Sequence, residues 1–191
     1  MNGIENVLIL AGISLDVFAT MECQGSLVAR IDKKQLTIIC GLMAVWQIAA
    51  LALGHYLSIL LYHNETAHDE NFVGLVIAAV IFFGLGTRLV VKAVRNERIW
   101  EHREDTFDIG RFLRMAIGTS VYSLFAGLAF GFLGTNVTRM LVIGVCITIA
   151  FVIFGMYTGY HFGFEHKTKA YVGGAILLWI AGIDVIVQYI I

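Results

Sequence analysis

The sequence contains no proline and few charged residues, and these two absences already restrict the fold. None of the 191 residues is Pro, and Asp, Glu, Lys and Arg together make up 14% of the chain, against 59% hydrophobic residues. A soluble domain of this length needs far more polar surface, and the mean hydropathy is +0.82. The composition therefore predicts an integral membrane protein, in which any helix break must come from glycine or polar residues.

Other absences exclude several classes of function. The three cysteines, Cys23, Cys40 and Cys146, lie in apolar segments without the spacing of a disulfide framework or a zinc site. The formal net charge is −1, which gives no reason to expect a nucleic acid as partner. The sequence has no G-x4-G-K-[ST] loop. We therefore expect a protein that is not an enzyme and has no tightly bound cofactor.

Long apolar runs are abundant instead, and six of them can each cross a hydrocarbon core of about 30 Å, which takes about 20 helical residues. They lie at 4–28, 37–62, 72–92, 112–134, 138–163 and 170–190. The connections are short and polar, apart from a longer one between Lys92 and Arg111. The predicted fold class is an all-α integral membrane protein with six transmembrane helices.

The charges of the connections predict the orientation. The odd-numbered connections are basic, whereas the second has no Lys or Arg and the fourth has only Arg139. By the positive-inside rule, both termini lie outside the cytoplasm, and we expect a multi-pass protein of a bacterial inner membrane. The basic residues are Arg30, Lys33 and Lys34 in the first connection, Lys92, Arg95, Arg98, Arg103 and Arg111 in the third, and Lys167 and Lys169 in the fifth.

A weak internal repeat relates the two halves of the chain. Residues 14–19 (S-L-D-V-F-A) are similar to 120–126 (S-V-Y-S-L-F-A), which places Asp16 opposite Tyr122. Since each half has three spans, a duplication would insert the halves in opposite senses, as in secondary transporters. The predicted units are a three-helix repeat at 1–92, a basic cytoplasmic linker at 93–111 and a second, inverted three-helix repeat at 112–191.

Asp16 is the residue around which a functional hypothesis forms. It lies in the middle of the first span, where a carboxylate costs at least about 2.5 kcal/mol on insertion scales and therefore faces a bundle interior or a water-filled path. Thr20 and Cys23 follow on the same helical face. We expect Asp16 to belong to a cation route; the alternative is a protonated packing residue held by hydrogen bonds.

Several motifs, in order along nearly the whole chain, resemble those of the MntP-type manganese exporters, relatives of the LysE transporter superfamily. Residues 12–19 (G-I-S-L-D-V-F-A) are similar to the family's first-helix signature S-[ML]-D-A-F-A, and 119–121 (T-S-V) open like its fourth-helix motif T-S-[LI]-D. The other matching elements are 41–54 with Gln47, 84–88 (G-L-G-T-R), and, near the end, Gly155, Gly159, Gly163, Lys167, Lys169, Ala170, Gly173 and Gly174. The resemblance implies an exporter with Mn²⁺ as its transported substrate.

The sequence departs from this family at two positions. The aspartate of the fourth-helix motif is Tyr122 here, and the glutamate that follows the third-helix element falls at Lys92. The family is thought to bind Mn²⁺ with acids from both repeats, so these departures bear directly on metal specificity.

The candidate metal ligands follow from the resemblance and from the oxygen preference of Mn²⁺. Asp16 and Thr20 come from the first span. Gln47, in the second span, offers a carbonyl oxygen or else makes a hydrogen bond between helices. Glu22 lies about 240° from Asp16 on a regular helix, so it shares an ion only if the helix breaks at Gly25; otherwise it lies near the cytoplasmic mouth, held by Arg30 or Lys33. The remaining candidates are Ser120 with Thr119, Tyr122, which ligates or fills the site, and Asp184, which replaces the missing acid or reaches the outer interface.

Two stripes of small residues are expected to serve packing, because glycines let membrane helices approach closely. They are Gly127, Gly131 and Gly134 in the fourth span and Gly155, Gly159 and Gly163 in the fifth.

We therefore expect a secondary active transporter that exports a divalent cation, with Mn²⁺ as the first candidate. Two alternatives remain open: a transporter of a different small cation, and a membrane protein of the same fold that has lost transport and serves in regulation or assembly. The expected partners are the divalent cation, the lipid bilayer and, as an open alternative, further copies of the chain.

Overall fold

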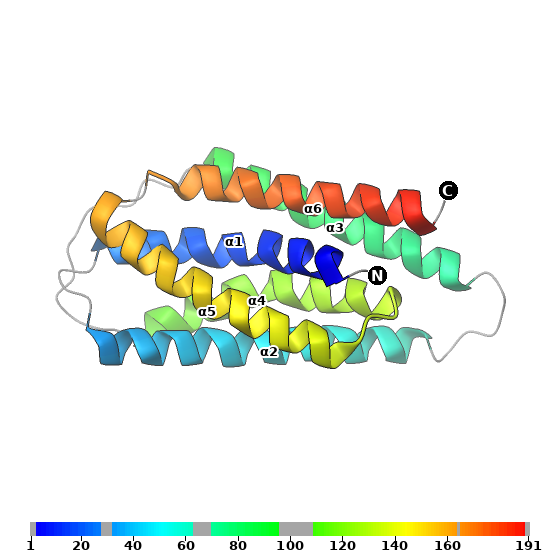
Figure 1. The fold of residues 1–191 in the computed structure, drawn as a ribbon, viewed down its shortest axis with the longest axis horizontal. Coiled ribbons are helices and arrows are strands. Elements are labelled where there is room, and N and C mark those ends of the chain that lie inside the picture. The colour runs from blue at the N-terminus through cyan, green and yellow to red at the C-terminus, as the bar shows by residue number, and fades with distance from the viewer. Residues whose placement is uncertain (1–2, 28–31, 63–69, 96–108, 164, 190–191) are drawn as a thin grey trace.

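The computed structural model consists of six long helices and describes residues 3–27, 32–62, 70–95, 109–163 and 165–189 (Figure 1). Each helix is long and apolar enough to cross a membrane, and the described residues include no strand. The predicted class, an all-α protein with six transmembrane helices, is thus confirmed. The helices are α1 (Gly3–Leu27), α2 (Lys33–Tyr62), α3 (Glu70–Arg95), α4 (Ile109–Phe132), α5 (Val137–Phe162) and α6 (Lys167–Tyr189).

The third helix is longer than its hydropathy predicts. The apolar run ends at Lys92, but α3 continues to Arg95, so Lys92 belongs to the helix and not to the connection. Most of the predicted linker at 93–111 lies outside the described residues, as do Arg30 and residues 63–69 of the second connection. The inverted repeat and its unit boundaries stay predictions.

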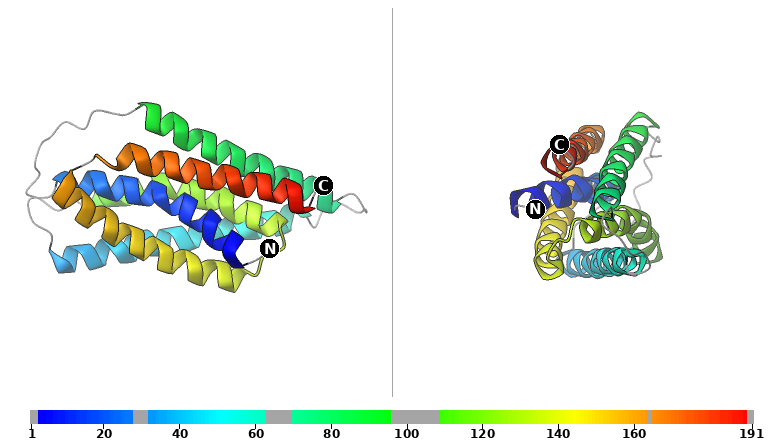
Figure 2. Two further views of the ribbon diagram at one scale, coloured as in Figure 1. Left: turned by 45° about the horizontal axis from the view of Figure 1, so that its top comes forward. Right: turned by 90° about the vertical axis from the view of Figure 1, so that its right-hand side faces the viewer.

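Helix α1 lies at the centre of the bundle. It packs against α4, α5 and α6, whereas α2 packs on α4 and α5, and α3 on α4 and α6. Figures 1 and 2 show α1 between the α3–α6 pair and the group formed by α2, α4 and α5. In the most apolar part of α1, 67% of residues are buried within the protein, against 33–44% in the other helices. A polar group on α1 is therefore enclosed by protein.

Four of the six stripe glycines make close helix contacts, as predicted. A Cβ atom on Gly155 or Gly159 of α5 would collide with the backbone of α1, and one on Gly127 of α4 would collide with the backbone of α2. Gly131 packs against Ser58 of α2. For the other two glycines the packing prediction is wrong: Gly134 and Gly163 have open space around them and positive φ angles of 62° and 71°. They follow the ends of α4 and α5, where the left-handed region favours glycine.

Replacing Gly159 by Val is expected to destabilise the protein. The new side chain would meet the backbone of Glu22, so α1 and α5 must separate, and overpacking of this kind costs about 1–3 kcal/mol. A lower melting temperature of the purified protein in detergent would show this. Gly84→Val is the matched control, because Gly84 is exposed on α3 with nothing within 4 Å. Equal melting temperatures for the two variants would contradict the close α1–α5 contact.

Candidate functional site: a buried ion pair at the end of a basic cavity

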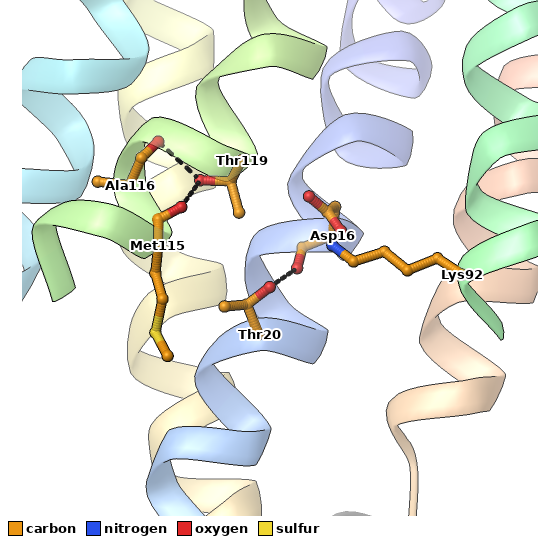
Figure 3. A network of polar contacts seen from close by, with 6 residues as sticks. All are labelled: Asp16, Thr20, Lys92, Met115, Ala116 and Thr119. Carbon is orange, nitrogen blue, oxygen red and sulfur yellow. Dashed lines mark hydrogen bonds and ion pairs between the residues drawn. The ribbon is translucent and has the colours of Figure 1, made fainter. Parts of the chain in front are cut away.

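An ion pair joins α1 and α3 at the middle of α1. The Lys92 Nζ atom lies 2.5 Å from the Asp16 Oδ1 atom and donates a hydrogen bond to it (Figure 3). The Asp16 side chain is 1% exposed and that of Lys92 is 40% exposed. The second carboxylate oxygen, Oδ2, is buried and has no hydrogen-bond partner in the described part of the chain. Asp16 therefore holds one cation and has further capacity to accept.

Aromatic rings and a second cation surround this pair. The Arg88 guanidinium lies 4.9 Å from the centre of the Tyr122 ring, and the Lys92 ammonium lies 5.6 Å from the same ring and 5.1 Å from that of Tyr171. Both rings belong to buried residues. Cation–π contacts of this length are attractive, so α3, α4 and α6 together fix the cations beside Asp16.

The candidate hydroxyl groups bond their own helices. The Thr20 hydroxyl donates to the Asp16 carbonyl oxygen at 2.8 Å, and the Thr119 hydroxyl lies 3.1 Å from the carbonyl oxygens of Met115 and Ala116 (Figure 3). The Ser120 hydroxyl donates to the carbonyl oxygen of Ile117. This is the usual pattern for Ser and Thr in membrane helices. Their oxygens keep lone pairs but lie in fixed backbone contacts.

Glu22 has a structural partner far away in the sequence. Its Oε1 atom accepts a hydrogen bond from the His166 backbone N–H at 2.9 Å and lies 3.5 Å from the His166 Nδ1 atom. Because α6 begins at Lys167, a carboxylate here satisfies a donor at the start of that helix and complements its dipole. The structure thus places Glu22 away from Asp16, near the end of α1 and the start of α6, with His166 as a partner. Of the two partners expected from the sequence, Arg30 lies outside the described residues.

The structure does not bring Gln47 or Asp184 to Asp16. Gln47 is buried, its Nε2 atom lacks a hydrogen-bond partner among the described residues, and it lies outside the set of residues that lines the cavity described next. Gly174 packs on Gly12, and Asp184 lies ten residues farther along α6, about 15 Å along the axis and on the side away from Asp16.

A cavity of about 650 Å³ extends from the ion pair to one end of the bundle. It runs from Tyr122 and Thr20 to Leu27, the last residue of α1, and Lys167, the first of α6. Toward the other end, α1 is enclosed by an apolar cluster. Its largest fully buried members are Ile9, Leu10, Ile13, Leu51, Phe82, Leu89, Phe130, Met140 and Leu178.

The charged groups that line this cavity are all basic among the described residues: Arg88, Lys92, Arg95 and Lys167. Within the same part of the chain, no three His, Cys, Asp or Glu side chains come together. A cation that reaches the inner end of the cavity would therefore meet one carboxylate, that of Asp16.

Comparison with known proteins supplies the family. A family model named Mntp and described as "Putative manganese efflux pump" matches residues 30–186. The chain belongs to the Mntp family. Its relatives named "Putative manganese efflux pump MntP" include a protein of Desulfitobacterium hafniense, 26% identical over all of this chain and 97% of the relative. A protein of Acetivibrio thermocellus is 24% identical over 93% of this chain and 87% of its own length. No solved structure matches the chain.

Sequence reasoning missed three residues of this Mntp-family site: Lys92 as the partner of Asp16, Arg88, and Tyr171. A signal for two of them was present, because Arg88 and Lys92 stand four residues apart near the end of an apolar run. Positions i and i+4 share a helix face, and charges within a span normally face the interior. No sequence signal marked Tyr171.

Proposed function

We propose that this protein exports Mn²⁺ by secondary active transport, with the Asp16 carboxylate as the cation-binding group. The observation that carries the proposal is the position of Asp16: it is fully buried and pairs with Lys92, which lines the inner end of a cavity that extends to the basic end of the bundle. The relatives' names supply the ion. Mn²⁺ is a hard cation that carboxylate, carbonyl and water oxygens bind well.

In this proposal, the Lys92 ammonium pairs with Asp16 when no Mn²⁺ is bound. When Mn²⁺ binds to Asp16, the Lys92 ammonium moves into the cavity, where its side chain is already 40% exposed. The carboxylate is thereby paired both before and after binding, which avoids the cost of a buried charge without a partner. Because Lys92 and Mn²⁺ replace each other, the Asp16 carboxylate keeps a cationic partner when the transporter holds no Mn²⁺.

The direction of export follows from the orientation of the bundle. With the basic connections in the cytoplasm and both termini outside, the cavity takes its ion from the cytoplasm, and the apolar cluster beyond Asp16 closes the outer path. In this proposal, α1–α3 and α4–α6 form two inverted repeats of an inner-membrane protein that rock around the site to release the ion outside, driven by a coupled ion gradient.

The Asp16–Lys92 pair also favours a second candidate function. A lysine that lines the cavity and already pairs with the buried Asp16 carboxylate is what a membrane protein that has kept the fold but lost transport would contain. In that case the pair would serve only to join α1 to α3.

Export can be tested in a manganese-sensitive bacterial host that lacks its own exporter. Expression of the protein is expected to restore growth in excess Mn²⁺ and to lower cell manganese several-fold, as measured by elemental mass spectrometry of washed cells. Iron, cobalt, zinc and magnesium are measured in the same samples, so that a lower content of one of them would identify a different exported cation. If every metal content is unchanged while the protein is present in the membrane fraction, the transport proposal fails and the second candidate stands.

A further inference from the structure

The cavity beside Asp16 has an excess of positive charge. Four cationic side chains line it, and none of its described lining residues is acidic. Asp16 lies behind Lys92 and pairs with it, and Arg88 and Arg95 add two more positive charges to the same lining. An excess of one sign, held between low-dielectric walls, concentrates the electric field and raises the local concentration of ions of the opposite sign.

Three of the four cations lie on the α3 wall of the cavity, where they can act together. Arg88, Lys92 and Arg95 come from the last two turns of α3 and line the same cavity, and Lys167 stands at the start of α6. Contact with the Tyr122 ring fixes the position of the Arg88 guanidinium. A guanidinium bound by its face to a ring still has N–H groups along its edge, and such an edge suits the two oxygens of a carboxylate or phosphate group.

The rest of the lining suits a small organic or inorganic anion. Thr119 and Gln24 add neutral polar groups, and Leu27, Val91 and Met115 add apolar wall. A volume of about 650 Å³ is within the usual range of ligand pockets, roughly 300–1,000 Å³. Rings of Arg and Lys are the means by which membrane proteins select anions.

We propose that this cavity binds a multivalent oxyanion, with carboxylate or phosphate groups held by Arg88 and Arg95 and by Lys92 and Lys167 around them. The site does not require manganese export. If export occurs, the anion has a second consequence: it offsets the positive wall that a divalent cation must pass to reach Asp16. The same phosphate chemistry could come from a free anion or from the headgroup of an anionic lipid.

Binding can be measured on the purified full-length protein in nanodiscs of neutral phosphatidylcholine, by calorimetric titration with citrate and with inorganic phosphate at matched ionic strength. The wild type is expected to bind at least one of the two. The double variant Arg88→Gln with Arg95→Gln is expected to bind at least about tenfold more weakly, because it loses the charge-assisted hydrogen bonds of two guanidinium groups. Arg139→Gln is the matched control, since Arg139 is exposed, lies in the first turn of α5 and does not line the cavity.

A second arm separates the two sources of the anion. In nanodiscs that contain phosphatidylglycerol, a lipid headgroup in the cavity would weaken citrate binding to the wild type. Phosphatidylglycerol would then be retained by the wild type, but not by the double variant, in native mass spectrometry. Unchanged citrate binding in these nanodiscs assigns the site to free anions.

Two outcomes would overturn the proposal: the wild type binds neither citrate, phosphate nor phosphatidylglycerol, or the folded double variant binds them as well as the Arg139→Gln control does. A loss of manganese export alone would not bear on the anion site, so the two proposals fail separately.

Discussion

Replacing Asp16 by Asn is expected to abolish Mn²⁺ export without unfolding the protein. No acidic residue lines the cavity in the described part of the chain, and Asp16 is the carboxylate that pairs with its lining residue Lys92; a neutral amide cannot hold a divalent cation there. The fold should persist because Lys92 is 40% exposed and its long side chain can keep the ammonium in the hydrated cavity. The readouts are cell manganese in the sensitive host, the amount of protein in the membrane and the melting temperature.

Asp184→Asn is the matched control for this experiment. It makes the same acid-to-amide change on α6, away from Asp16 and outside the lining of the cavity, and it is expected to leave export at the wild-type rate. If Asp16→Asn exports manganese as well as the control does, Asp16 is a packing residue and the proposed cation site is wrong. Loss of export in both variants at normal membrane levels would extend the site to Asp184.

Combining Lys92→Glu with Tyr122→Asp is expected to create a strong Mn²⁺ site. The Lys92 Nζ atom lies 2.5 Å from the Asp16 Oδ1 atom and 5.6 Å from the centre of the Tyr122 ring, so acids at these positions would converge on Asp16. They are also the positions at which the sequence departs from the acids of the MntP-type pattern. Since affinity for hard cations rises with the number of carboxylate ligands, we expect Mn²⁺ to bind at least about tenfold more tightly.

Calorimetric titration of the purified variant with Mn²⁺ measures this gain. Three neighbouring acids repel one another without metal, so Mn²⁺ should also raise the melting temperature of this variant more than that of the wild type. The variant Lys92→Gln with Tyr122→Asn is the control, because it removes the same ammonium and ring without adding charge. A gain no larger than that of the control would show that the three positions do not form one site.

The fold could be predicted from the sequence because membrane insertion depends on local properties. A run of about 20 apolar residues suffices for a span, and each of the six runs became one helix. The error at the end of α3 has a physical reason: hydropathy treats Lys92 as the end of the span, whereas a lysine has an apolar stem and a charged end that reaches sideways. Here it reaches Asp16, and the helix continues to Arg95.

The candidate site could be predicted only in part. The cost of a mid-span acid pointed to Asp16, but its partner depends on how α3, which packs on α4 and α6, is placed beside α1. The contact between Glu22 and His166 joins residues 144 positions apart, and no local pattern encodes it. Gln47 and Asp184 were candidates because they are polar within apolar runs; Gln47 is not among the described residues that line the cavity, and the helix register places Asp184 away from Asp16.

The most direct test of the central claim is an anomalous-difference map from crystals of the wild-type protein soaked in Mn²⁺. The proposal predicts a manganese peak within coordination distance of the Asp16 carboxylate, with the Lys92 ammonium displaced into the cavity. A map in which Lys92 still pairs with Asp16, and in which the only manganese peaks lie elsewhere, would contradict it.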